Sequence, residues 1–214
     1  MKRILLIIFL LGLFLGSIDV SAQSEGAQSR KLFPSRSQLA DQPHTVFKVS
    51  VGPAMMFSKM YVGVPAKTYN RRWGFDVMGD LQHIWSKGWG FGVNYAFNHT
   101  SFGQEGFSLH YVGPSAVYAR RLVGGFGFDV SLGLGYGRFV EETHYIKYRS
   151  ALARDGFGSM LQAGLEYLIT ENLGVGVEAN LLTVLCKQND IQLPNDEHFG
   201  VRRFNLLAGL RLYF

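Results

Sequence analysis

The sequence predicts an all-β protein, an eight-stranded antiparallel up-and-down barrel. Three observations predict it: apolar residues alternate with small or polar ones along most of the chain, tight turns separate pairs of alternating segments, and the connections are alternately short and long. A period of two places successive side chains on opposite faces of a strand, whereas a helix would scatter both sets around its circumference. The 26 Gly residues would also destabilise helices.

The clearest strand begins at Phe126. Every second residue from there to Tyr136 is large and apolar, and the residues between them are Gly, Ser or Asp. Seven further segments share this alternation: 47–56, 73–82, 89–98, 109–122, 161–167, 173–181 and 205–214. The alternation is ambiguous in 109–122, where analogy with the first strand assigns to the outer face Val112, Pro114, Ala116 and Tyr118.

The barrel is expected as a single domain over residues 46–214. Residues 1–22 have the layout of a secretory signal peptide, because a short basic start precedes the uncharged apolar run 4–16 and small residues end at Ala22. That run is shorter than the roughly 20 residues of a membrane-spanning helix, which disfavours the alternative of a retained anchor. Residues 23–45 are polar and lack apolar periodicity, so we expect a flexible periplasmic segment.

Composition excludes several classes of protein. The net charge of +5 is spread along the chain and not gathered in blocks, so no nucleic-acid partner is expected. The single Cys186 cannot form an internal disulfide. The histidines lack the paired spacing of metal ligands, and the Gly-x-Gly patterns lie in strands and not before helices. We therefore expect no metal and no cofactor.

The assignment of the two faces favours a transmembrane barrel over a soluble, lipocalin-like one. The apolar rows carry no charged residue, and a Lys or Arg at mid-depth of a lipid face would cost roughly 2–4 kcal/mol. The opposite rows are small or charged, which suits a narrow eight-stranded interior. Aromatic residues fall towards strand ends, as at membrane interfaces. The interface aromatics we assign are Trp73, Trp89, Tyr95, Tyr136 and Tyr167.

The inward rows carry seven charged residues: Lys48, Asp76, Asp80, Asp129, Glu166, Glu178 and Arg211. Buried charges persist only when they are paired and hydrogen-bonded. Lys48 on the first strand and Arg211 on the last should meet where the barrel closes, with Asp80 close by. This pattern predicts a salt-bridged plug that fills the lumen; the alternative is a narrow, porin-like ion path.

The chain ends on a hexapeptide, Gly209-Leu210-Arg211-Leu212-Tyr213-Phe214. The spacing of Gly209, Leu212 and Phe214 resembles the β-signal that the barrel-assembly machinery reads, although Leu207 stands where the signal usually has a polar residue. Together with the strand pattern, it makes the chain resemble the small eight-stranded outer-membrane barrels, the OmpA/OmpX-like family, especially versions common in Bacteroidota.

The resemblance implies a monomeric protein of the bacterial outer membrane, surrounded by membrane lipid and lipopolysaccharide and inserted by the assembly machinery. No residue follows Phe214, so the peptidoglycan-binding domain of larger members is not expected. Short turns at 86–88, 123–125 and 170–172 should lie at one end and the longer polar stretches at the other. Those stretches are 58–71, 99–107, 141–155 and 185–201.

The function expected is structural or surface interaction, without catalysis. The long loops are candidate ligand contacts, because 141–155 mixes Lys and Arg with Glu and Tyr, and basic groups can hold lipopolysaccharide phosphates. The alternative is a hydrolase that modifies lipid A, since His99 and Ser101 share a face with Glu105 nearby. That triplet loosely resembles the His-x-Ser of outer-membrane lipid A deacylases, but their longer local motif is missing.

Overall fold

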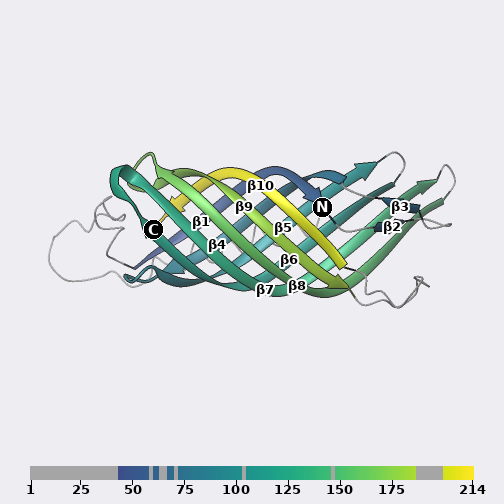
Figure 1. Ribbon diagram of the computed structural model, residues 1–214, viewed down its shortest axis with the longest axis horizontal. Coiled ribbons are helices and arrows are strands. Elements are labelled where there is room, and N and C mark those ends of the chain that lie inside the picture. Colours follow the sequence, from purple (N-terminus) through teal and green to yellow (C-terminus); the bar gives the residue numbers. More distant parts are fainter. Residues whose placement is uncertain are drawn as a thin grey trace, which may run out of the picture. The chain divides into compact units, whose positions relative to one another are not determined.

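A computed structural model describes residues 43–57, 60–62, 67–69, 72–102, 105–145, 148–186 and 200–214. Within them, eight antiparallel strands form a closed barrel in which each strand pairs with its neighbours in the chain and β1 closes against β10 (Figure 1). The barrel strands are β1 (His44–Met56), β4 (Arg72–Ile84), β5 (Trp89–Phe102), β6 (Glu105–Arg121), β7 (Phe126–Tyr145), β8 (Tyr148–Leu168), β9 (Leu173–Cys186) and β10 (Gly200–Tyr213). The predicted fold class is confirmed. The predicted signal peptide lies outside the described residues.

β1 begins at His44, within the segment that we expected to be flexible. The N–H of Thr45 donates to the carbonyl of Phe214 at 3.2 Å, and the N–H of Phe214 donates to the carbonyl of Thr45 at 2.9 Å. These backbone bonds extend the pairing of β1 with β10 to residues that precede the apolar alternation of β1. They can do so because hydrogen bonds between strands do not depend on side-chain type.

Three tight connections lie at one end of the barrel, here called the turn end. The N–H of Trp85 donates to the carbonyl of Trp89 at 2.8 Å, and the N–H of Leu122 donates to the carbonyl of Phe126 at 2.7 Å. Gly88 has a φ of 83°, a conformation that residues with a Cβ rarely adopt. The short hairpins predicted from the sequence therefore form as expected.

At the opposite end, here called the loop end, two predicted loops are mostly strand. β5 and β6 pair as far as Phe102 and Glu105, and β7 and β8 pair as far as Tyr145 and Tyr148. The prediction of loops over 99–107 and 141–155 was wrong. It rested on the lack of an alternating apolar face in these segments, but strands can pair through backbone hydrogen bonds without such a face. A further two-stranded sheet, β2 (Met60–Val62) with β3 (Lys67–Tyr69), lies in the first long connection.

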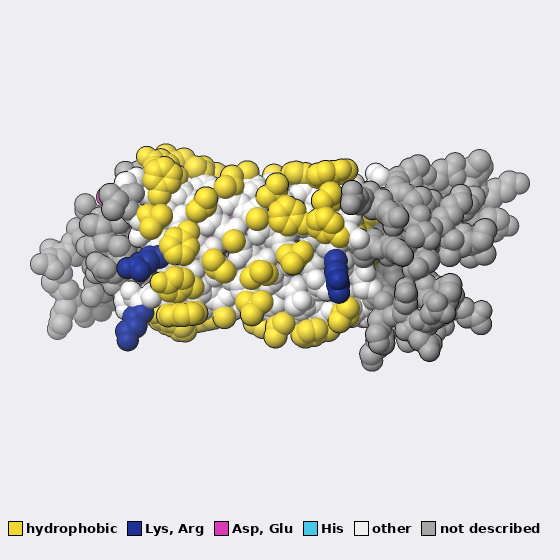
Figure 2. Space-filling model, viewed as in Figure 1, with side chains coloured by type: hydrophobic (Ala, Val, Ile, Leu, Met, Phe, Trp, Pro, Cys, Tyr) yellow, Lys and Arg dark blue, Asp and Glu magenta, His cyan; other side chains and the backbone are white. Residues whose placement is uncertain are grey.

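The large apolar side chains face outward from the barrel. Trp73, Leu165 and Leu206 have exposed fractions of 68%, 60% and 55%. In β6, Val112 is 43% exposed and Tyr111 only 1%, so the outward parity assigned by analogy is confirmed. Figure 2 shows hydrophobic side chains spread over this face of the wall, with Lys and Arg side chains only towards its two ends.

Charged residues bound the apolar wall. Among the barrel residues whose side chains are described, Asp, Glu, Lys and Arg occur on the outward rows only at Arg120 near the turn end and at Arg138, Asp155 and Arg202 near the loop end. The structure has no helix, among the residues it describes, of the length and apolarity needed to cross a membrane.

The interior holds two apolar clusters with a charged layer between them. The small cluster near the turn end consists of Val46, Ile84, Leu168 and Tyr213. The larger one, here called the loop-side cluster, consists of Met56, Met78, Ala96, Phe107, Leu109, Tyr111, Phe139, Met160, Leu182, Val184, Cys186, Val201 and Leu207. The expectation of an interior filled by small and paired polar residues was therefore incomplete.

Glycines make room for these large inward side chains. A Cβ at Gly158 would lie 2.7 Å from Cδ2 of Tyr111, and one at Gly137 would lie 2.4 Å from Cγ1 of Val184. Both distances are far shorter than a normal contact between carbon atoms. Inward rows rich in glycine thus mark places where a bulky side chain from elsewhere on the wall crosses the lumen.

Candidate functional site

The charged layer of the lumen is the candidate functional site. All seven inward charges predicted from the sequence are buried; Glu166 is the most exposed of them at 7%. Two more basic residues join them, Arg203 and Arg121, whose side chains are 1% and 9% exposed. Sequence reasoning missed Arg203 because it precedes the last clear alternation. It missed Arg121 because that residue ends the strand of ambiguous parity.

Lys48 reaches across the lumen. The register makes Lys48 a neighbour of Arg211 on β10 and of Asp80 on β4, which places together the three residues expected at the closure. The ion pair of Lys48, however, is with Asp129 on β7, at 2.7 Å between Nζ and Oδ2. In the strand order of the closed barrel, β7 stands opposite β1. The pair therefore joins opposite walls.

Arg211 and Glu166 organise the rest of the layer. The guanidinium of Arg211 pairs with Glu178, and its Nε lies 3.8 Å from Oε2 of Glu166. Glu166 also lies 2.9 Å from Nη1 of Arg121 and accepts the hydroxyl of Tyr213. The network thus links β6, β8, β9 and β10.

The Arg211 side chain needs a glycine beside it. A Cβ at Gly176 would lie 2.6 Å from Cζ of Arg211. Gly176 is on β9, where an inward side chain would occupy the space of the guanidinium. The glycine at position 176 of β9 therefore leaves the space in which the Arg211 guanidinium of β10 lies.

Asp80 is held by amide groups. It accepts from Nδ2 of Asn94 at 2.7 Å and from Nε2 of Gln162 at 3.1 Å. Gln162 lies on β8, which stands opposite β4 in the ring, and it also accepts the hydroxyl of Ser131 at 3.0 Å. This chain of hydrogen bonds is a second connection across the lumen.

Asp76 and Arg203 form a separate pair nearer the loop end. Oδ2 of Asp76 lies 2.7 Å from Nη2 of Arg203, and the two side chains are 0% and 1% exposed. Removing one partner of a buried pair leaves an uncompensated charge, which costs about 3–5 kcal/mol. The arrangement can hold the walls together and obstruct the lumen. Within the described residues, no group of three or more His, Cys, Asp or Glu could hold a metal ion.

His99 contacts a different serine from the one expected. Its Nδ1 lies 3.1 Å from Oγ of Ser108, its cross-strand neighbour on β6. Ser101 is exposed on the same strand as His99, and the side chain of Glu105 lies outside the described part. The structure therefore shows a contact of His99 with Ser108, and the grouping of His99, Ser101 and Glu105 as a hydrolase site stays a prediction.

The five assigned interface aromatics all point outward. Trp73, Trp89, Tyr95, Tyr136 and Tyr167 are between 40% and 68% exposed. At the turn end, Trp89 packs beside Tyr118 and Tyr167 packs beside Phe126, each pair with ring centroids 5.0 Å apart. At the loop-end side, the Tyr136 hydroxyl donates to Asp155. The rings therefore occur towards both ends of the wall.

The three residues of the candidate assembly signal lie along the closure of the barrel. Leu212 and Phe214 are 41% and 47% exposed on the outer wall. Gly209 lies where β10 approaches β1 closely, since a Cβ there would be 2.0 Å from the carbonyl oxygen of Val49. A glycine is thus required at this position by the closure itself.

No family model and no curated protein matches the chain. Solved structures do match, among them the surface protein NspA of Neisseria, with a TM-score of 0.57 at 14% identity over 80% of this chain and 97% of that one. The outer membrane protein OprG of Pseudomonas aeruginosa gives 0.49 at 10% identity, over 82% and 98%. The attachment invasion locus protein Ail of Yersinia pestis, in complex with the heparin analogue sucrose octasulfate, gives 0.47 at 16%, over 79% and 99%. At such identities the likeness concerns the fold alone. The match to the neisserial protein, with the highest TM-score of the three, indicates that the chain has the fold of a small eight-stranded barrel.

Proposed function

We propose that the protein is an integral β-barrel of the bacterial outer membrane, with a sealed lumen, that acts through its outer surface. One observation carries the proposal: the outward rows are apolar and free of Asp, Glu, Lys and Arg between the level of Arg120 and that of Arg138 and Arg202. A strand needs about 9–11 residues to cross the hydrocarbon core, a length that Phe126–Tyr136 supplies. A soluble monomer rarely exposes so large an apolar surface.

Two further features support a membrane location. Exposed Trp and Tyr side chains towards both ends of the wall suit the two interfaces of a bilayer. Closure of β1 against β10 leaves no strand edge unpaired within the barrel, as lipid demands. The similarity in fold to the neisserial surface protein agrees with this proposal.

The lumen favours a structural role over a narrow pore. The Lys48–Asp129 ion pair and the Asp80–Gln162 hydrogen bond cross it, and the loop-side cluster packs above them. An ion would have to displace both layers. With the lumen filled, contacts with other molecules would be made at the loop end. Basic side chains there, such as Arg138, could contact lipopolysaccharide phosphates.

Gel mobility and conductance test the proposal. The native protein from outer-membrane fractions should migrate differently before and after boiling, and the purified barrel should not conduct in planar bilayers. Recovery in a soluble fraction without a mobility shift would contradict the membrane location. Stable single-channel currents would instead contradict the sealed lumen and favour the pore.

A further inference from the structure

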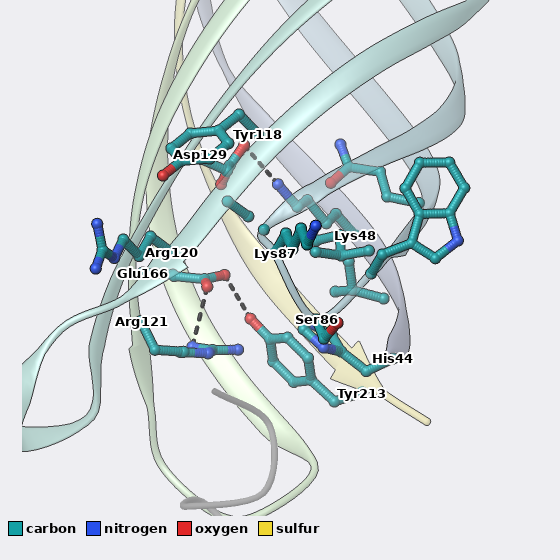
Figure 3. Close-up of a pocket in the computed structure, with 16 residues that line it drawn as sticks. His44, Lys48, Ser86, Lys87, Tyr118, Arg120, Arg121, Asp129, Glu166 and Tyr213 are labelled. Atoms are coloured by element: carbon teal, nitrogen blue, oxygen red, sulfur yellow. Dashed lines mark hydrogen bonds and ion pairs between the residues drawn. The ribbon is translucent and has the colours of Figure 1, made fainter. Parts of the chain in front are cut away.

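A cavity of about 390 Å³ lies inside the turn end of the barrel, below the charged layer (Figure 3). Its volume falls within the range of small-molecule sites. Strands β1, β4, β6, β7, β8 and β10 contribute to its lining, together with the turn between β4 and β5. Its charged lining residues are Lys48, Lys87, Arg120, Arg121, Asp129 and Glu166.

The charge of the lining is unbalanced. Lys48 and Arg121 lie inside with the two acidic residues, and the exposed Lys87 and Arg120 add two positive charges around the entrance. The carboxylates are already engaged, Asp129 by Lys48 and Glu166 by Arg121 and by the hydroxyl of Tyr213 (Figure 3). An ammonium has three N–H donors and a guanidinium has five, so both basic groups of these pairs keep donors for another acceptor.

Gln82 is an independent sign of a ligand. It lines the cavity and is fully buried, yet neither its Nε2 nor its Oε1 has a hydrogen-bond partner. A buried amide left unpaired opposes folding, so an unpaired amide in a cavity wall is explained if it serves a bound molecule. The guanidinium of Arg121, elsewhere in the lining, lies 4.5 Å from the centroid of the Tyr213 ring, and its Nη2 also lacks a hydrogen bond.

We propose that this cavity binds a small oxyanion, a phosphate or a carboxylate, that enters from the turn end. The amide of Gln82 and the charged groups of Lys48 and Arg121 donate to it, since donors exceed acceptors in the lining. Lys87 and Arg120, which are exposed, attract the anion to the entrance. The site lies at the end opposite the long loops and does not depend on the surface role proposed above.

Calorimetric titration of the full-length barrel in detergent tests the site. Sodium phosphate and sodium acetate serve as separate probes at constant ionic strength, with chloride as the balancing anion. We expect saturable binding of at least one probe at one site per barrel, and the tighter of the two identifies the anion class. Gln82→Leu should weaken binding at least tenfold while leaving the unfolding temperature unchanged or higher, because the native amide makes no hydrogen bond to lose.

Two other variants make the test specific. Arg121→Lys keeps the charge but removes the planar fork, so it should also weaken binding. Arg138→Gln, at the exposed loop end, should bind like the unmodified protein. The proposal is overturned if neither probe saturates, if Gln82→Leu and Arg121→Lys both bind like the unmodified protein, or if Arg138→Gln weakens binding as much as they do.

Discussion

The charged layer and the loop-side cluster fill two levels of one lumen by different physical means. In the charged layer each group depends on a named partner, such as Asp129 for Lys48 or Glu178 for Arg211. In the loop-side cluster, buried side chains such as Leu182 and Phe139 are held mainly by many weak packing contacts. Removing one partner in the charged layer should therefore cause a large loss of stability at once. In the loop-side cluster, the loss of stability should grow with the volume of side chain removed.

The largest effect is expected in the charged layer. Arg211→Ala removes the partner of Glu178 and one of the partners of Glu166, and should lower the free energy of unfolding by about 3–5 kcal/mol. Urea unfolding in lipid vesicles, followed by tryptophan fluorescence, measures this. Arg138→Ala is the matched control, because its pair with Asp155 is 3.9 Å long and half exposed. Equal stability of Arg211→Ala and the unmodified barrel would refute the salt-bridged plug.

Truncation in the loop-side cluster should cost about as much or somewhat less. Leu182 is completely buried, and Leu182→Ala should lower the free energy of unfolding by about 2–5 kcal/mol through lost contacts and a cavity. Leu181→Ala, on the outward face of the same strand, provides the comparison. A larger loss for Leu181→Ala than for Leu182→Ala would show that the wall and not the lumen carries the stability.

Overpacking the same cluster should have a smaller effect. Gly158→Ala places a Cβ against the ring of Tyr111, so we expect a loss of about 1–3 kcal/mol in the same unfolding assay. Combining it with Tyr111→Leu should recover part of that loss by removing the obstructing ring. No recovery in the double variant would mean that the backbone of β8 and not the Tyr111 ring sets the limit.

The smallest effect should come from replacing a whole ion pair. Exchanging both members of the Asp76–Arg203 pair for apolar residues, in Asp76→Leu with Arg203→Met, should leave stability nearly unchanged, since both desolvation costs disappear together. Arg203→Met alone should be clearly destabilised. If the double variant is as unstable as Arg203→Met alone, the attraction within the Asp76–Arg203 pair exceeds the cost of desolvating its two charges. The stability of the barrel would then depend on this ion pair more than we infer.

Several elements were predictable because their physical cause is local. Alternation of apolar and small residues from Phe126 to Tyr136 indicated a strand and its outward face, and glycine at Gly88 indicated a tight turn. The inward position of Lys48 and Arg211 followed from the same period. The extension of β7 and β8 to Tyr145 and Tyr148 was not predictable, because a ladder beyond the apolar band leaves no hydrophobic pattern.

The sequence by itself determined which side chains point outward and which point into the lumen, because the period of a strand is a property of adjacent residues. Only the tertiary structure decided which inward groups meet. Closure of the barrel sets β1 opposite β7, so that Lys48 binds Asp129 and not its wall neighbour Asp80. It also gathers Gln82, Lys48 and Arg121 around one cavity. Distances across a closed lumen depend on strand order and register, which no local stretch of residues encodes.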